Sequence, residues 1–249
     1  MNLILIQTDE LDDRQVHLKD RRAEHLRKIL KVKVGDTVRV GIVNGLMGTG
    51  TVADISRHTV ILTIEASTPP PVRLELDLIL ALPRPIMLKR VLAQIAALGV
   101  NHLFLINANR VEKSFFEASP TKYGDFAPFL HNGLEQAIDT IAPTVSIHHR
   151  FKPFIEDILP TVTASRKIIA HPDGITSIAD NFCSTPPGKT LLAIGPEGGW
   201  IDHELSLFHD ARFLPFSLGP RILRVDTAVP AIIAQIALLQ QRATQGVAE

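Results

Sequence analysis

The stretch LLAIGPEGGW, residues 191–200, joins an apolar run to three glycines and a proline, and a helix-like segment follows it. A strand that ends in a glycine-rich turn before a helix is typical of an open α/β sheet, in which ligands bind beyond the carboxyl ends of the strands. Glycines at that place let the main chain approach a ligand closely and adopt positive φ angles. The stretch matches neither the G-x-G-x-x-G nor the G-x-x-x-x-G-K-[ST] pattern, so it favours no nicotinamide or triphosphate cofactor. Taken alone, it is also compatible with a simple tight turn between a strand and a helix.

The chain around this stretch alternates between strand and helix patterns. Apolar runs predict strands at 74–82, 102–106, 144–147, 166–170, 190–194 and 213–217. Apolar residues at helical spacing predict helices near 88–98, 126–137, 153–159, 202–210 and 227–241. Strands that alternate with helices indicate a mostly parallel sheet that is covered on both faces.

A different pattern precedes residue 70. Short β-rich runs at 2–6, 37–43, 49–55 and 59–64, with one basic helical segment near 20–31, predict a small β-barrel or sandwich whose strands are not parallel. Three successive prolines at 69–71 can neither donate to a sheet nor continue a helix. We therefore expect a domain boundary there, with one domain at 1–70 and a second at 71–249.

Composition narrows the class of protein. The 249 residues have a formal net charge of zero, which argues against a protein held to nucleic acid by charge over its whole surface. Residues 19–33 nevertheless carry seven basic and two acidic side chains, which fits either a solvated helix face or a phosphate-binding surface. The single cysteine, Cys183, excludes an internal disulfide and a multi-cysteine zinc site. No apolar run approaches 18 residues and the N-terminus is no secretory signal, so we expect a cytoplasmic protein without a membrane span.

A second unusual loop, FSLGPRILRVDTAVP at 216–230, follows the last predicted strand. Thr227 is expected to be the N-cap of the last helix, because Pro230 then falls at the third helical position, where a missing N–H needs no partner. That helix, AIIAQIALLQ, is apolar nearly all round and should be buried. Arg221, Arg224 and Asp226 would then be desolvated, and desolvated charges need partners. The loop therefore suggests a functional site more strongly than a purely structural one.

Together the two loops closely resemble the paired C-terminal motifs of those SPOUT-superfamily methyltransferases that methylate N3 of a uridine in 16S ribosomal RNA. The resemblance rests on IGPEGGW at 194–200, with Glu204 after it, and on LGPRILRVDTA at 218–228. The segment AEHLRKILKVKVGDTVRV at 23–40 is similar to the opening domain of that family, a PUA-like RNA-binding barrel. The similarity spans almost the whole chain, and the two motifs are highly specific as a pair.

The resemblance implies an α/β fold in which an N-terminal PUA-like β-barrel precedes a SPOUT domain with a C-terminal trefoil knot at about 166–241. It also implies S-adenosylmethionine as the cofactor, held mainly by main-chain groups of three loops at 170–174, 194–199 and 218–223. The residues expected to bind it are His171, Ile194, Gly195, Pro196, Glu197, Gly198, Gly199, Leu218, Gly219, Ile222, Leu223 and Thr227. The superfamily works as homodimers, and the apolar helix at 227–241 is a candidate for part of the interface.

Methyl transfer to N3 of uracil is an in-line displacement that also requires removal of a weakly acidic imide proton. Two roles are open for the charged residues of the loops. Asp226 or Glu197 could accept the proton, and Arg221 or Arg224 could stabilise the negative charge on the uracil oxygens. An arginine cannot itself be the base. No metal is expected, because the sequence around His203 does not follow the H-E-x-x-H pattern.

The substrate implied by the resemblance is 16S ribosomal RNA, and the family favours RNA within the small ribosomal subunit over free RNA. The target base must leave its stack, and the RNA must be held through phosphates and shape. The basic segment supplies the candidate RNA contacts, which are Arg21, Arg22, Arg27, Lys28, Lys31 and Lys33.

Some positions depart from the family pattern. Asp226 replaces a common glutamate, Ala97 replaces the acid of a Lys–Glu pair, and Ile138-Asp139 stands where Gly-Arg is usual. Two alternatives therefore stay open. One is a noncatalytic ribosome-assembly factor that binds RNA, and the other is a knotted methyltransferase that acts on another RNA, such as tRNA.

Overall fold

The computed structural model describes residues 2–118, 121–122, 124–174, 176–183 and 188–245. The chain divides into two compact units, one formed by residues 1–72 with 130–142 and the other by residues 73–129 with 143–249. The first unit is thus discontinuous in sequence. Among the described helices, none is long and apolar enough to cross a membrane.

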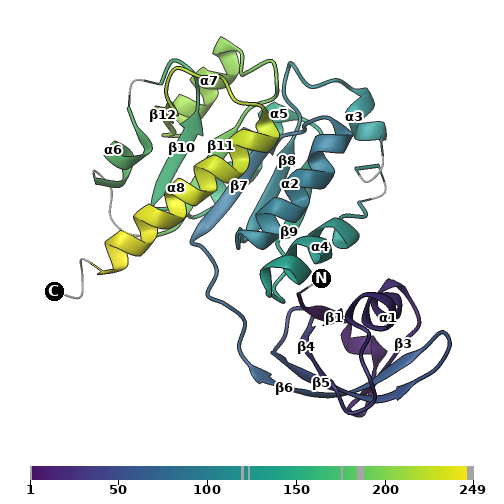
Figure 1. Cartoon of the computed structure of the whole chain (residues 1–249). Coiled ribbons are helices and arrows are strands. Elements are labelled where there is room, and N and C mark those ends of the chain that lie inside the picture. Colours follow the sequence, from purple (N-terminus) through teal and green to yellow (C-terminus); the bar gives the residue numbers. More distant parts are fainter. Residues whose placement is uncertain (1, 119–120, 123, 175, 184–187, 246–249) are drawn as a thin grey trace. The chain divides into compact units, whose positions relative to one another are not determined.

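The first unit contains one curled sheet of six strands (Figure 1). Its order is β1 (Ile4–Ile6), β4 (Thr37–Ile42), β5 (Met47–Ile55), β6 (Val60–Thr68), β3 (Gln15–Leu18) and β2 (Leu11–Asp12). The expectation that the strands are not parallel holds for four of the five strand pairings, and the parallel pairing of β1 with β4 is the exception. The connection between them contains β2, β3 and a helix, which is long enough to return the chain in the same direction.

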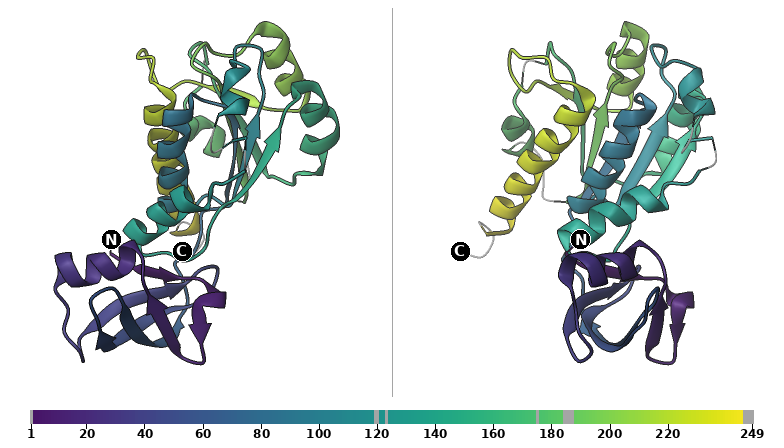
Figure 2. Two further views of the ribbon diagram at one scale, coloured as in Figure 1. Left: turned by 90° about the vertical axis from the view of Figure 1, so that its right-hand side faces the viewer. Right: turned by 45° about the vertical axis from the view of Figure 1, so that its right-hand side comes forward.

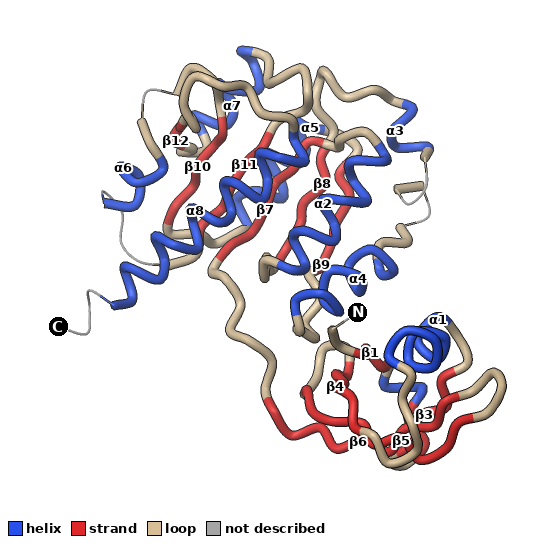
Figure 3. The backbone as a smooth tube through the Cα atoms, in the orientation of Figure 1, coloured by secondary structure: helices blue, strands red, loops and turns tan. Residues whose placement is uncertain are grey.

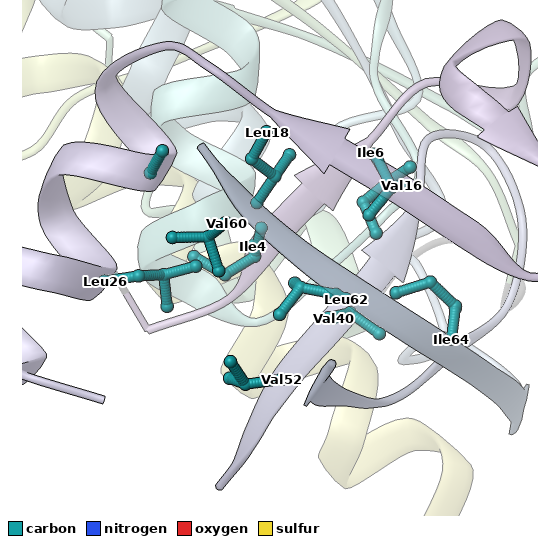
Figure 4. Packing of buried hydrophobic residues seen from close by; sticks show 11 residues of the cluster. Ile4, Ile6, Val16, Leu18, Leu26, Val40, Val52, Val60, Leu62 and Ile64 are labelled. Atoms are coloured by element: carbon teal, nitrogen blue, oxygen red, sulfur yellow. The ribbon is translucent and has the colours of Figure 1, made fainter. Parts of the chain in front are cut away.

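Alternating side chains of this sheet build the core of the first unit. Along β6, Val60, Leu62 and Ile64 are buried and the residues between them are not. The helix α1 (Arg21–Glu24) and the π-helix η2 (His25–Leu30) cover the core with Ala23 and Leu26. Figure 4 shows the cluster, which comprises Ile4, Ile6, Val16, Leu18, Ala23, Leu26, Val40, Val52, Val60, Leu62 and Ile64.

The second unit contains a six-stranded sheet whose neighbouring strands are all parallel. The predicted parallel α/β sheet is confirmed in each strand. The order is β12 (Leu214–Phe216), β10 (Arg166–Ala170), β11 (Thr190–Ile194), β7 (Leu76–Ala81), β8 (His102–Ile106) and β9 (Thr144–His148). Every residue of β7 and β11 is buried, as expected for central strands with helices on both faces.

Helices cover both faces of this sheet. The helices of this unit are α2 (Pro85–Ala97), α3 (Ser114–Glu117), α5 (Phe151–Pro153) with η3 (Phe154–Ile158) and η4 (Leu159–Thr161), α6 (Ile178–Cys183), α7 (Asp202–Asp210) and α8 (Val225–Gln245). Helix α4 (Ala127–Ala137) belongs to the first unit from Leu130 onward. Helices α2 and α8 lie side by side on one face, and α7 lies on the other (Figures 2 and 3). The loops after the strands consequently gather at the carboxyl edge.

The start of α8 differs from the prediction. The helix begins at Val225, because the N–H groups of Thr227 and Ala228 already bond to the carbonyl of Arg224 at 3.0 and 2.8 Å. Thr227 is therefore a helical residue and not the N-cap. Pro230 lies inside the helix, where its missing N–H leaves only the carbonyl of Asp226 without its usual partner.

The expectation that α8 is buried all round was also wrong. One face is buried by Val229, Ile232, Ile233 and Ile236, whereas Leu238 is 51% exposed. The helix is thus amphipathic in this single chain, and its outer face is open.

One departure from the family pattern, Ile138-Asp139, lies at the end of α4. Ile138, which follows the last residue of α4, has a φ of 60°, a value at which a glycine is far less strained than a β-branched residue. The carboxylate of Asp139 is 6% exposed and accepts the N–H groups of Thr140 and Ile141 at 2.6 and 3.0 Å. Asp139 therefore stabilises a turn in the first unit.

Candidate functional site

The three predicted loops line one pocket at the carboxyl edge of the parallel sheet. Because β12, β10 and β11 are parallel neighbours, the segments after these strands emerge at the same edge. The pocket has a volume of about 460 Å³, within the range of small-molecule sites. Its lining includes His171, Ile194, Gly195, Pro196, Glu197, Gly198, Gly199, Leu218, Gly219, Ile222 and Leu223, together with Trp200, Arg221 and Ala228. Of the predicted cofactor residues, Thr227 is absent from the described lining.

The glycines at 195 and 198 make room for the protein's own side chains. A Cβ on Gly195 would lie 3.0 Å from the indole of Trp200, and a Cβ on Gly198 would lie 3.0 Å from Cδ of Arg110. Only Gly199 within this loop has a positive φ, at 74°. The sequence argument attributed these glycines to close approach of a ligand, but packing beneath the loop accounts for two of them.

Trp200 anchors the loop to the helix that follows it. Its ring lies 5.0 Å from that of Phe208 in α7, and Phe208 lies 4.9 Å from Phe213 and 5.5 Å from Phe151. Trp200 is 4% exposed and its Nε1 has no hydrogen-bond partner among the described residues. This aromatic cluster holds the end of β11 against α7.

Glu204 ties the glycine loop to the loop after β8. Its carboxylate accepts the N–H of Asn109 at 2.7 Å and the N–H of Ile201 at 3.1 Å, and the residue is 3% exposed. Arg110 adds a second tie, because its guanidinium donates to the carbonyl of Gly198. Sequence reasoning did not identify Arg110 or Asn109. The signal available was their position directly after a predicted strand at the ligand-binding edge.

The first loop is packed against the end of β12. The N–H of His171 donates to the carbonyl of Phe216 at 3.0 Å, and a Cβ on Gly174 would overlap the main chain of Phe216. His171 therefore uses its backbone donor within the protein, and its side chain is only 20% exposed. These contacts hold two walls of the pocket together.

Only two of the four candidate catalytic residues line the described pocket. Arg221 and Glu197 are exposed and line the pocket, whereas Arg224 is exposed but does not belong to the described lining. The expectation that both arginines are desolvated was wrong, because the loop that carries them is open to solvent even though α8 buries one face. Asp226 does not line the pocket among the described residues either. Its Oδ2 lies 3.3 Å from Nη1 of Arg90 in α2, and its Oδ1 is buried without a described hydrogen-bond partner.

The basic segment of the first unit is largely neutralised. Arg22 is 9% exposed and donates to Glu10, Asp20 and the carbonyl of Leu5, so it cannot face a phosphate. Hydrogen bonds from Arg22 hold the pKa of Glu10 below its usual value. Burial raises the pKa of Asp20, but hydrogen bonds from Arg22 outweigh it and the net shift is downward.

Two more of the candidate RNA contacts have acidic partners. Arg21 forms two hydrogen bonds with the buried carboxylate of Glu135, at 2.9 and 2.7 Å, and Lys28 pairs with Glu24. Lys31 and Lys33 are exposed, Arg27 is half-buried, and none of the three has a carboxylate partner among the described residues. The free cations of the segment are therefore fewer than the sequence suggests. Within the residues described, no group of three or more His, Cys, Asp or Glu side chains could hold a metal ion.

The protein is an α/β protein with a parallel sheet, helices on both faces of the sheet and a separate small β unit. The pocket formed by loops at the carboxyl edge of the sheet is suited to bind a small molecule. The chain matches the RNA methyltransferase domain family over residues 70–237 and the RNA methyltransferase PUA domain family over residues 18–65. It belongs to the RNA methyltransferase family, as its two glycine motifs predicted.

Named relatives match the chain over nearly its full length. Ribosomal RNA small subunit methyltransferase E of Treponema pallidum is 28% identical over 247 residues, covering 95% of this chain and 90% of the relative. The protein of the same name from Synechocystis is 26% identical over 238 residues, covering 95% of this chain and 78% of the relative. The crystal structure of ribosomal RNA small subunit methyltransferase E from Neisseria gonorrhoeae, bound to S-adenosyl methionine, has a similar fold, with a TM-score of 0.77 and 21% identity over 96% of this chain and 98% of that one.

Proposed function

We propose that this protein uses S-adenosylmethionine to methylate N3 of a uridine in 16S ribosomal RNA of the small ribosomal subunit. The observation that carries the proposal is the meeting of the loops at 170–173, 194–200 and 216–223 around one pocket of about 460 Å³. The names of the relatives support ribosomal RNA of the small subunit as the substrate. The choice of N3 of uridine rests on the resemblance of the two glycine motifs.

The pocket suits S-adenosylmethionine in size and in chemistry. Gly219 has a φ of 105° and no atom within 4 Å of where its Cβ would be, so its bare main chain faces open space in the pocket lining. Ile194, Ile222 and Leu223 add apolar walls. When bound, the cofactor would supply a methyl group on its sulfonium, which the uracil nitrogen would attack as the carbon–sulfur bond breaks and S-adenosylhomocysteine leaves. Main-chain groups of the three loops would hold the cofactor. Thr227 lies outside the described lining, next to Ala228, which belongs to it.

The charged residues near the pocket are proposed to stabilise negative charge, to accept a proton and to position the start of α8. Arg221 lines the pocket and donates to the uracil oxygens that carry negative charge once N3 loses its proton, with Arg224 in support from the same loop. Glu197, one of the two carboxylates in the described pocket lining, accepts that proton. Asp226 is held by Arg90 and acts as a positioning residue for the start of α8.

The first unit is proposed to bind RNA. The match to a PUA domain supports a PUA-like barrel formed by residues 1–70, with residues 71–249 as the methyltransferase domain and a trefoil knot within about 166–241. Arg27, Lys31 and Lys33 remain the candidate phosphate contacts, with Lys28 beside them. A cytoplasmic location is part of this proposal, because small ribosomal subunits are assembled there.

The open face of α8 supports a homodimer. Leu238, which is 51% exposed, and Leu239 line a cavity of about 590 Å³ next to the loops at 176–179 and 217–219. A second copy of the chain would cover these apolar side chains. Light scattering should find a dimer in the native protein and a monomer in Leu238→Glu.

The decisive test combines donor binding with product mapping. Calorimetry with S-adenosylmethionine should detect one site per chain, and purified small subunits from cells that lack the gene should gain N3-methyluridine when protein and donor are added. Donor binding without transfer to any RNA would favour the noncatalytic assembly factor. Methylation of tRNA in place of 16S ribosomal RNA would favour the other alternative.

A further inference from the structure

Three arginines from three separate loops belong to the pocket lining or contact a residue of it. Arg84 lies between β7 and α2, Arg110 lies in the loop after β8, and Arg221 lies in the loop after β12. The backbone N–H of Arg84 lies 3.4 Å from Oε1 of Glu197, and the guanidinium of Arg110 donates to the carbonyl of Gly198. Glu197, Gly198 and Arg221 line the pocket, so Arg84 and Arg110 lie beside its lining and Arg221 lies within it. We call these three residues the arginine rim.

The guanidinium groups of the arginine rim are available to bind an anion. Arg84, Arg110 and Arg221 are exposed, and none of them has a carboxylate within 4.0 Å in the part of the chain that the structure describes. Arg110 uses one of its five N–H donors on Gly198, which leaves the others available. The acidic residues of the pocket lining are Glu197 and Asp173. Unpaired guanidinium groups around a pocket are suited to bind phosphate groups, because their planar donors match phosphate oxygens.

Apolar side chains accompany two of these arginines. Ile86 follows Arg84 by two residues and is 65% exposed, and Ile222 follows Arg221 directly and is 86% exposed. A ligand made only of anions would leave these aliphatic groups in water. A nucleotide strand offers both phosphates and flat, apolar faces of bases and sugars, so the combination fits single-stranded RNA.

We propose that Arg84 and Arg110 bind the RNA phosphates on either side of the target nucleotide and so position the extruded base over the pocket. This inference rests on the proposed function and adds substrate contacts in the second unit to those proposed for the first. Extrusion of a base loses stacking and pairing energy of a few kcal/mol, which contacts to the neighbouring phosphates offset. Neither arginine transfers a proton or touches the reacting atoms, so both are positioning residues.

Matched substitutions test the rim. Arg84→Gln and Arg110→Gln each remove one charge, and Arg212→Gln removes one charge from the exposed turn before β12, at the opposite edge of the sheet. Each rim variant should raise the KM for RNA about 10-fold with little change in kcat, and should lower the slope of log binding constant against log salt by about 1. Arg212→Gln should leave KM and kcat unchanged. Calorimetry should find the Kd for S-adenosylmethionine within twofold of wild type in all three.

The outcomes separate the explanations. If the Kd for S-adenosylmethionine rises as much as the KM for RNA, the arginines bind the carboxylate end of S-adenosylmethionine, and the inference is overturned. Unchanged KM and salt slope, or an equal loss in Arg212→Gln, would overturn it as well. Arg110→Lys keeps the charge and should retain the salt slope, which distinguishes loss of a phosphate contact from damage to the loop at Gly198. If wild type binds RNA but transfers no methyl group, the proposed function fails, whereas the salt slopes still test the rim.

Discussion

Replacing Glu204 by alanine should weaken donor binding although Glu204 does not belong to the described pocket lining. Its carboxylate accepts two backbone N–H groups, from Asn109 at 2.7 Å and from Ile201 at 3.1 Å, and so connects the glycine loop to the loop after β8. Alanine leaves both N–H groups without this partner. We expect the loop at 195–201 to lose its fixed position.

The magnitude follows from the two hydrogen bonds. A hydrogen bond to a charged group contributes about 1.5–3 kcal/mol, and we take the low end because Asn109 is exposed and Ile201 is only half-buried. The loss of both is then about 3 kcal/mol. Since 1.4 kcal/mol corresponds to a factor of ten, the Kd for S-adenosylmethionine should rise by up to about 100-fold. Glu204→Gln keeps one acceptor oxygen and should lose about half of this free energy, which corresponds to roughly a 10-fold rise.

Calorimetry with S-adenosylmethionine measures the affinity, and thermal melting measures the accompanying loss of stability. Asp202→Asn is the matched control, because Asp202 lies in the same first turn of α7, is exposed and forms no described hydrogen bond to the loop. It should bind the donor as wild type does. A Glu204→Ala protein that binds the donor within twofold of wild type and melts at the same temperature would refute the reasoning.

Three further predictions concern stability. Phe208→Ala removes a fully buried ring from the aromatic cluster around Trp200 and should lower the free energy of unfolding by about 3–5 kcal/mol in urea titrations, and an unchanged midpoint would contradict this. Arg21→Ala leaves the buried carboxylate of Glu135 unpaired and should destabilise the protein by about 2–3 kcal/mol, below the usual range because Arg21 is 57% exposed; adding Glu135→Gln should recover part of the loss. Glu10 has a folded pKa below its unfolded value, so its contribution is present above about pH 4.3 and is lost as pH falls through the folded pKa. Melting curves from pH 5 to pH 3 should therefore fall less steeply in Glu10→Gln, and parallel curves would show that the Arg22 pair contributes nothing.

The periodicity of the sequence was sufficient for the parallel sheet. Strands such as 190–194 and 102–106 are short apolar runs bounded by turn residues, and their pattern depends on local backbone geometry alone. The edge rule indicated a site at the loop after 190–194, and the family resemblance added the loops at 170–174 and 218–223, which line the same pocket.

Prediction of the ends of elements and of individual charges was less successful. Thr227 and Pro230 suggested a helix that starts later than α8 does, since a proline is tolerated one turn further in than the simple rule allows. Arg22 looked like a surface cation in a basic segment, yet it is buried among Glu10 and Asp20. Charge counts along a chain carry no information about which residues fold inward.

The amino-acid sequence by itself determined the class of fold, the position of the loops at one edge and membership of a methyltransferase family. Only the tertiary structure decided which side chains support those loops, because contacts such as Glu204 to Asn109 and Arg90 to Asp226 join residues 95 and 136 positions apart. The local pattern of apolar and polar residues predicts only the backbone conformation of residues close together in the sequence. The partners of a distant charge depend on how the folded strands and helices bring their ends together.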